Sequence, residues 1–167
     1  MISNGSRKKF SDTFLKNVEN LTFDKHIWNK ENIAIFIETS FGVKYGGFVY
    51  SKIDKYRTID ENGNVHGIID PKSFVFSFKN NEPMKYEMKD EKKNESTFLL
   101  HKYDDHRLCS FRDICVGKNG FKSYCYQDKD CYYDYQGNEK ALTGITGLED
   151  EDEFEIKRII VVQFQWF

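Results

Sequence analysis

Phenylalanine recurs at every second position in the run formed by Phe74, Phe76 and Phe78, and this pattern limits the fold more than any other feature of the chain. Alternate side chains of an extended strand point to the same side, so the three rings share one face and the smaller Val75 and Ser77 share the other. The preceding Asp-Pro dipeptide is typical of a turn that leads into a strand, because proline cannot donate to a neighbouring strand. Three rings on one face need a facing layer, so we expect them in the core between two layers.

The composition favours strands over helices. Of the 167 residues, 16% are aromatic, and alanine occurs only at positions 34 and 141. Aromatic side chains are enriched in strands, whereas alanine is the strongest helix former. A chain of this length is typical of one domain. We therefore expect a flexible polar tail over residues 1–9 and a single domain over residues 10–167.

Residues 32–39 predict a central strand, because both faces of the segment are apolar. Ile33, Ile35 and Ile37 lie on one face, and Ala34 and Phe36 lie on the other. A short turn then leads into a second strand over residues 43–51, which completes a hairpin. We expect the isoleucine face to pack in the same core as the phenylalanine rings.

Two adjacent glycines, Gly46 and Gly47, lie inside the second strand of this hairpin. Glycine weakens a strand, so its presence there needs a specific reason. The pair predicts a bulge, a backbone with positive φ, or the close approach of another part of the chain.

The N-terminal part carries a helical pattern, whereas the rest reads as short strands. An apolar pattern with helical spacing predicts an amphipathic helix packed on a sheet. The residues that would share its apolar face are Phe10, Phe14, Leu15, Val18 and Leu21. Strand-like segments then recur at intervals of roughly ten residues. They lie at 84–88, 97–103, 108–111, 123–126 and 156–164. We predict a mainly β fold, a two-layer antiparallel β-sandwich with one or two flanking helices.

Charge and hydropathy narrow the class of protein. The net charge is −2, so no basic field marks the chain, and we do not expect it to bind nucleic acid. The sequence has no long uncharged apolar run, and we expect no transmembrane segment. The polar N-terminus lacks the apolar centre of a secretory signal, which predicts a cytoplasmic location.

The strongest catalytic candidate is a thiol that follows two histidines. Cys109 lies close in sequence to His101 and His106, and a histidine can activate a thiol when the two side chains meet in space. A polar hairpin turn explains the same pattern, and no nucleophile signature surrounds Cys109. We favour a protein without a catalytic site. The alternative is a small thiol-dependent or hydrolytic enzyme that uses Cys109 with His101 or His106.

The sequence predicts neither a metal nor a cofactor. The four cysteines, at positions 109, 115, 125 and 131, lack the close pair spacing of zinc ligands. Asp128 and Asp130 begin a spacing similar to that of a calcium loop, but Tyr133 stands where such a loop needs glycine. We expect free, buried thiols.

Several segments taken together resemble the TLDc family. The first is the aromatic-Gly-Gly strand around Gly46 and Gly47, and the second is the segment 70–78 with the sequence DPKSFVFSF. Its Ser-Phe-x-Phe-Ser pattern begins at Ser73. Further similar segments are Asp113-Ile114, residues 123–126, residues 135–144 and the closing apolar strand. The resemblance covers about residues 31–165, and its hallmark positions are Gly46, Gly47, Ser73, Phe74, Phe76 and Phe78.

The resemblance implies a β-sandwich flanked by helices and no established catalytic activity. It also implies a link to protection against oxidative stress and to binding of the vacuolar proton-pumping ATPase. We expect an interaction module whose partner is a protein, with subunits of that ATPase as candidates. From the residues themselves, two segments are candidate contact surfaces: one is rich in tyrosine, a frequent interface anchor, and the other is acidic. The residues concerned are Tyr132 and Tyr133, and Glu149, Asp150, Glu151 and Asp152.

Overall fold

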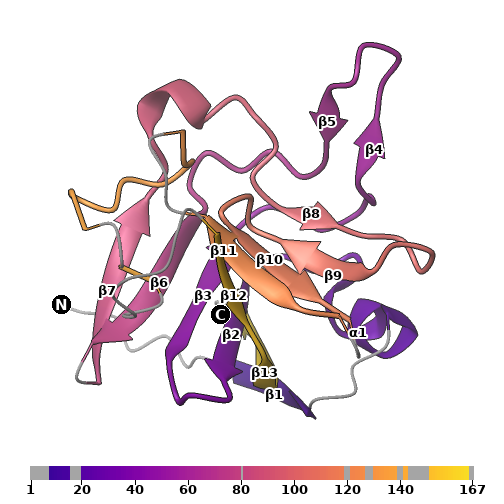
Figure 1. The fold of residues 1–167 in the computed structure, drawn as a ribbon. Coiled ribbons are helices and arrows are strands. Elements are labelled where there is room, and N and C mark those ends of the chain that lie inside the picture. The colour runs from indigo at the N-terminus through magenta and orange to yellow at the C-terminus, as the bar shows by residue number, and fades with distance from the viewer. Residues whose placement is uncertain are drawn as a thin grey trace, which may run out of the picture.

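The computed structural model describes residues 8–15, 20–79, 81–118, 121–126, 130–138, 141–142 and 151–165. The predicted fold class is confirmed: the protein is mainly β, its sheets are antiparallel, and the described part has one short α-helix (Figure 1). That helix is α1 (Asn20–Ile27), and a 3-10 helix covers Asp90–Lys92.

Two sheets make up most of the described structure. The larger has the strand order β1 (Lys8–Leu15), β13 (Ile156–Gln165), β2 (Ile33–Thr39), β3 (Lys44–Val49), β6 (Phe74–Lys79) and β7 (Glu82–Glu87). The smaller has the order β12 (Glu151–Phe154), β11 (Ser123–Tyr126), β10 (Ile114–Gly117), β9 (Arg107–Ser110) and β8 (Leu99–Leu100). A separate hairpin pairs β4 (Thr58–Ile59) with β5 (Val65–His66).

A single stretch of chain joins the two sheets at one corner. β12 ends at Phe154 in the smaller sheet, and β13 begins at Ile156 in the larger sheet. Between them, the carbonyl of Glu155 accepts a hydrogen bond from the Ser40 amide at 2.9 Å, just beyond the end of β2. Strands that pass from one sheet to the other in this way form the corners of packed sheets.

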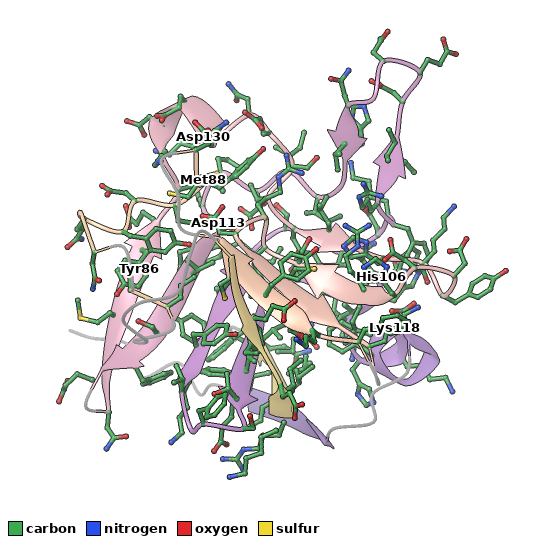
Figure 2. All side chains as sticks on the ribbon, viewed as in Figure 1. Tyr86, Met88, His106, Asp113, Lys118 and Asp130 are labelled. Carbon is green, nitrogen blue, oxygen red and sulfur yellow. The ribbon has the colours of Figure 1, made fainter. Side chains whose placement is uncertain are left out.

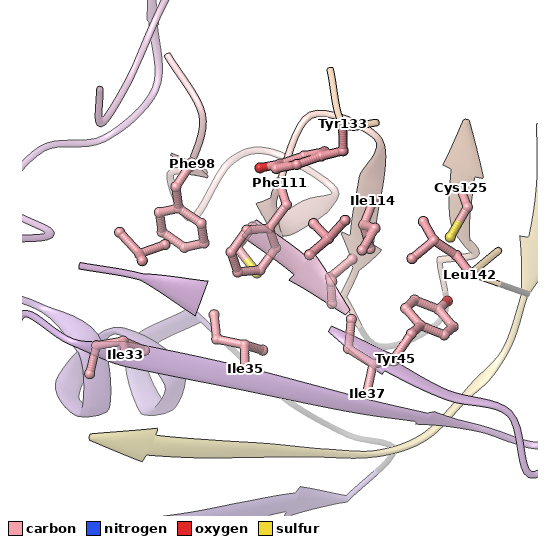
Figure 3. Close-up of a cluster of buried hydrophobic side chains, with 14 of the residues drawn as sticks. Ile33, Ile35, Ile37, Tyr45, Phe98, Phe111, Ile114, Cys125, Tyr133 and Leu142 are labelled. Atoms are coloured by element: carbon pink, nitrogen blue, oxygen red, sulfur yellow. The ribbon is translucent and has the colours of Figure 1, made fainter. Parts of the chain in front are cut away.

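The core lies between the sheets. Ile33, Ile35 and Ile37 of β2 are at most 1% exposed, and they face Phe111 and Ile114 of the smaller sheet (Figure 3). The hairpin β2–β3 and the central position of β2 are therefore as the alternating isoleucines predicted.

The prediction that the phenylalanine rings enter this core is wrong. Val75 of β6 is fully buried in the inter-sheet core, so Phe74 and Phe76 point to the other side of the larger sheet. There they meet Phe36 and Phe48, with ring centroids 5.0 Å apart for Phe36–Phe76 and 5.3 Å apart for Phe48–Phe74. The small face of β6 fits the space under the second sheet, and the rings cover their own sheet from outside. Phe78 continues this outer row, 6.0 Å from Phe76.

The prediction of a close approach at the two glycines is confirmed. A Cβ on Gly46 would lie 1.9 Å from the backbone oxygen of Ile35, and one on Gly47 would lie 2.4 Å from the ring of Phe111. The β2–β3 register runs without a bulge, and neither glycine has a positive φ. The pair therefore allows close contact on both faces of β3, Gly46 with its neighbouring strand and Gly47 with the core.

The predicted helix from residue 10 is wrong, because residues 8–15 form β1 and α1 begins at Asn20. Phe10 and Phe14 are four residues apart, a spacing that puts two side chains on one face of a helix and also on one face of a strand. The long apolar strand β13 offers all eight residues of β1 a partner, and this pairing decides between the two. Lys8 and Lys9, predicted in a flexible tail, begin this strand, and Val18 lies outside the described residues.

Candidate functional site

A buried carboxylate organises the tyrosine-rich segment. Asp113, directly before β10, is 2% exposed (Figure 2). Its oxygens accept hydrogen bonds from the amide of Tyr132 at 2.9 Å, the amide of Tyr133 at 3.1 Å and the hydroxyl of Tyr135 at 3.0 Å. Burial raises the pKa of Asp113 to about 6, against the opposing effect of these hydrogen bonds. Asp113 thus holds the 132–135 segment against the smaller sheet.

The same segment extends the edge of the larger sheet. The Lys89 amide donates to the carbonyl of Tyr132 at 2.9 Å, and the Asp134 amide donates to the carbonyl of Glu87 at 2.8 Å. These bonds flank an isolated bridge between Met88 and Tyr133. The segment therefore connects the two sheets, with Asp113 on one side and the end of β7 on the other.

The structure separates the two tyrosines that the sequence placed on one candidate surface. Tyr133 is fully buried and belongs to the inter-sheet core, whereas Tyr132 is half-buried and reaches the surface. Adjacent residues of an extended segment point to opposite sides, which explains the difference. Of this pair, Tyr132 alone is accessible to a partner.

Tyr132 is the centre of a charged group at the surface, which we call the Tyr132 cluster; it consists of Lys92, Glu95, Arg112 and Tyr132. The Tyr132 hydroxyl donates to Glu95 Oε2 at 2.6 Å, and the Arg112 guanidinium donates to the same hydroxyl and lies 4.4 Å from the ring centroid. Lys92 Nζ lies 4.8 Å from that centroid and 3.3 Å from Glu95. The hydrogen bond from Tyr132 and the cations hold the pKa of Glu95 below its usual range. Arg112 has a φ of 65°, a left-handed conformation that is rare for a residue with a side chain.

The acidic segment is a strand where it is described. Glu151 and Asp152 lie in β12 and pair with Tyr126 and Cys125 of β11. Glu149 and Asp150 lie outside the described residues. Acidic residues on an edge strand discourage pairing with other chains, which is a structural role that needs no partner.

A second buried polar group surrounds His101, which is 1% exposed. Its Nδ1 lies 3.2 Å from Asp105 Oδ2, and its Nε2 lies 3.4 Å from the hydroxyl oxygen of Ser110. Arg107 holds Asp105 through its Nε at 2.9 Å, its Nη2 at 2.8 Å and its amide at 2.8 Å. Burial opposes the ionisation of Asp105, but the bonds from Arg107 outweigh it and keep the pKa of Asp105 below its usual range.

The order Asp105, His101, Ser110 is that of a serine hydrolase relay, but its surroundings differ from an active site. Burial and the nearby Arg107 charge lower the pKa of His101 to about 4, so the imidazole is neutral at neutral pH. Ser110 is itself 5% exposed, so its hydroxyl has little access to a substrate. These hydrogen bonds stabilise the turn between β8 and β9.

The structure does not bring Cys109 to the imidazole of His101. Cys109 precedes Ser110 in β9, so it points to the opposite face of the sheet, into the core, and it is fully buried. Burial raises the pKa of its thiol, and a protonated, buried thiol is a poor nucleophile. His106 lies in the exposed turn, with 52% of its side chain accessible. Sequence reasoning missed Ser110 and Arg107. The predicted strands at 97–103 and 108–111 form a hairpin in which Leu99 pairs with Ser110, and that pairing would have placed Ser110 near His101.

The hallmark positions of the TLDc resemblance serve packing and local hydrogen bonding. The Ser73 hydroxyl donates to the carbonyl of Phe48 at 2.9 Å and ties the start of β6 to β3. The carboxylate of Asp70 accepts from the amides of Tyr50 at 2.5 Å, Ser51 at 3.1 Å and Lys72 at 3.1 Å. These contacts fix the entry into the phenylalanine strand.

Within the residues that the structure describes, no group of three or more histidine, cysteine, aspartate or glutamate side chains is arranged to hold a metal ion. All four cysteines are buried. Among the described helices, none has the length and apolar character needed to cross a membrane. Comparison of the chain with protein-family models and with curated proteins finds no match.

Proposed function

We propose that this chain is a non-enzymatic interaction module of the TLDc kind, which binds a protein partner through the Tyr132 cluster. The observation that carries the proposal is the anchoring of an accessible tyrosine by a buried carboxylate. Asp113 fixes the backbone of Tyr132 from below, and Arg112 and Glu95 fix its hydroxyl. Tyrosine and arginine are frequent energetic centres of interfaces, and a surface fixed before binding loses less entropy.

The partner that we propose follows from the TLDc resemblance. It is a subunit of the vacuolar proton-pumping ATPase, and the associated role is protection against oxidative stress. An enzymatic role is less favoured, because Cys109 lies in the core and the Ser110 hydroxyl is buried. A cytoplasmic location belongs to the same proposal.

A binding measurement with purified ATPase tests this proposal. The chain is immobilised, and its affinity for the purified complex is compared between wild type and Tyr132→Ala. We expect the substitution to weaken binding by about tenfold or more, the loss typical of an interface centre. Phe41→Ala is the matched control, since Phe41 is an exposed aromatic in the β2–β3 turn, 76% accessible.

Both variants must keep the circular dichroism spectrum of the wild type. Unchanged affinity in Tyr132→Ala would remove the Tyr132 cluster from the interface, and no binding by the wild type would overturn the proposed partner. Hydrolysis of generic ester substrates that is lost in Ser110→Ala would support an enzyme instead.

A further inference from the structure

The outer side of the larger sheet carries an apolar cluster in which, among the residues that the structure describes, every side chain comes from that sheet itself. Its members lie in β2, β3, β6 and β13. The one described α-helix, α1, contributes Phe23 and Ile27 to the inter-sheet core instead. We call this cluster the outer face: its buried members are Ala34, Phe48 and Val162, and its half-buried members are Phe36, Phe74, Ile160 and Phe164.

The shortest side chains of the outer face lie between longer ones. The strand register places Val162, Ala34, Phe48 and Phe74 in one row across the four strands. Ala34 and Val162 are both 2% exposed. The longer, half-buried Phe36 and Ile160 pair with each other in the next row, and Phe164 follows Val162 on the other side. An apolar side chain of a partner placed above Ala34 and Val162 would therefore be surrounded by larger apolar side chains.

The size of the outer face matches one α-helix. Adjacent strands lie about 4.8 Å apart, so β13 and β6 are about 14 Å apart across β2 and β3, and the positions from Ile160 to Phe164 span about 13 Å. A helix is about 10 to 12 Å wide, and its i and i+4 positions are about 6 Å apart, close to the spacing of about 6.6 Å between successive outward side chains of a strand. A second copy of the chain fits less well, because a stable interface covers about 800 Å² on each partner and these positions enclose roughly 200 Å².

The charged residues that border the outer face are of both signs. At β7, Lys85 Nζ lies 4.6 Å from the centroid of the Phe74 ring and 2.8 Å from Glu87. Beside Phe36 and Ile160, Arg158 contacts Glu38. Anionic lipids and nucleic acids are attracted to clusters of cations, and borders in which carboxylates accompany the cations do not select them. Recognition therefore depends on the apolar centre, and the borders suit a partner that carries charges of both signs.

We propose that the outer face binds one amphipathic α-helix of a partner protein, laid along the strands with its apolar side chains at positions i, i+4 and i+7 toward the sheet. A helix packed on a sheet is one of the common ways to cover an apolar sheet face, and an apolar patch bordered by polar residues marks an interaction site. The outer face is separate from the Tyr132 cluster, and this proposal does not depend on the partner proposed for that cluster.

Titration of the full chain with a synthetic peptide tests the proposal. The peptide has about 18 residues, because shorter helices are marginal in water, with leucines on one helical face and equal numbers of glutamate and lysine elsewhere. The isoleucine methyl groups of the protein are followed by NMR. We expect a saturable shift at Ile160, on the outer face, and none at Ile59, which is 54% exposed in the separate hairpin β4–β5. A peptide of the same composition whose leucines do not share a face should leave both signals in place.

Ile160→Lys should weaken binding of the striped peptide about tenfold, because it places a charge in the apolar centre, and Ile59→Lys is the matched control that should leave it unchanged. Both variants are checked by circular dichroism, and the methyl shifts of the wild type decide if Ile160→Lys does not fold. The proposal is overturned if the Ile160 methyl does not shift, if it shifts equally with the unstriped peptide, or if a folded Ile160→Lys binds as the wild type does. An Ile160 shift that follows protein concentration alone would show a second copy on the face, and one caused by phosphatidylcholine vesicles would show lipid; either would also overturn it.

Discussion

The regions around Asp113 and His101 are both buried and polar, but they have different structural roles. At Asp113 a carboxylate accepts bonds from two backbone amides and a hydroxyl of a distant segment, and so positions Tyr132 at the surface. At His101 a neutral imidazole bridges Asp105 and Ser110 within one hairpin and presents nothing to solvent. The first region holds a tyrosine in place at the surface, whereas the second region stabilises a turn.

Of the changes that test this comparison, removal of the Asp113 carboxylate should have the largest effect on the free energy of unfolding. Asp113→Ala leaves two amides and the Tyr135 hydroxyl buried without their acceptor, and we expect a loss of about 3 kcal/mol or more in the free energy of unfolding. Asp134→Ala is the control, because the exposed Asp134 caps the nearby Gln136 amide at 2.9 Å and should cost below about 1 kcal/mol. Urea denaturation measures both. Similar losses in the two variants would show that the buried carboxylate does not anchor the segment.

The two regions should respond to acid with opposite signs. The folded-state pKa of Asp113, about 6, lies above the ordinary value of 3.8 expected in the unfolded chain, so the folded protein binds this proton first and the contribution of Asp113 becomes more favourable as pH falls from 6 to 4. The folded-state pKa of His101, about 4, lies below 6.5, so the unfolded chain binds that proton first and stability is lost over the same interval. Each contribution amounts to about 3 kcal/mol over the full interval.

Two substitutions separate these contributions. Asp113→Asn should make the loss of stability between pH 7 and pH 4 larger than in the wild type, and His101→Gln should make it smaller. Denaturant titrations at a series of pH values measure the slopes. If both variants change the slope in the same direction, the two groups do not titrate as their burial requires.

The bond between His101 and Ser110 should contribute less. Its length of 3.4 Å is near the limit for a hydrogen bond, so Ser110→Ala should cost about 1 kcal/mol and leave the Asp105–Arg107 pair intact. Thermal denaturation provides the measurement, with Ser123→Ala as a comparison, since the Ser123 hydroxyl accepts a shorter 2.8 Å bond from the Gly117 amide. A larger loss of stability for Ser110→Ala than for Ser123→Ala would show that the bond between His101 and Ser110 contributes more to stability than its length indicates.

Tyr132→Phe should have the smallest effect on stability. It removes the hydroxyl that contacts Glu95 and Arg112 but keeps the ring beneath the two cations, and partly exposed polar contacts of this kind are worth below about 1 kcal/mol. Urea denaturation of this variant should match the wild type closely, although binding to a partner is expected to weaken. A loss similar to that of Asp113→Ala would mean that the Tyr132 cluster is a structural element.

The sequence predicted local patterns well and the orientation of faces poorly. Alternation placed the isoleucines of β2 on one face, and that prediction is confirmed. The same rule shows which phenylalanines share a face but not which face meets the second sheet, because the phenylalanine face and the smaller face of Val75 and Ser77 can each be covered. The four-residue spacing of Phe10 and Phe14 fits two kinds of element, and the choice depends on β13, far along the chain.

The sequence named the tyrosine-rich segment of the candidate site but not the contacts that hold it in place. Alternation within an extended segment could have shown that one of Tyr132 and Tyr133 is buried. The contact between Asp113 and Tyr132 spans 19 positions and follows no repeat, so no local pattern reveals it. Cys109 points away from the imidazole of His101 because its face of β9 is turned toward the core. The spacing of cysteine and histidine in the sequence does not show which face that is.

The position of β13 determines when the protein can fold. This strand lies between β1 and β2, and its ion pair from Lys157 to Glu38 spans 119 positions of the chain. Until β13 has been synthesised, β1 and β2 lack the strand that separates them, and the smaller sheet lacks β12, which belongs to the same stretch. We therefore expect both sheets to form together in one slow cooperative step that follows the synthesis of β13, with unpaired strand edges exposed to aggregation or chaperones before it.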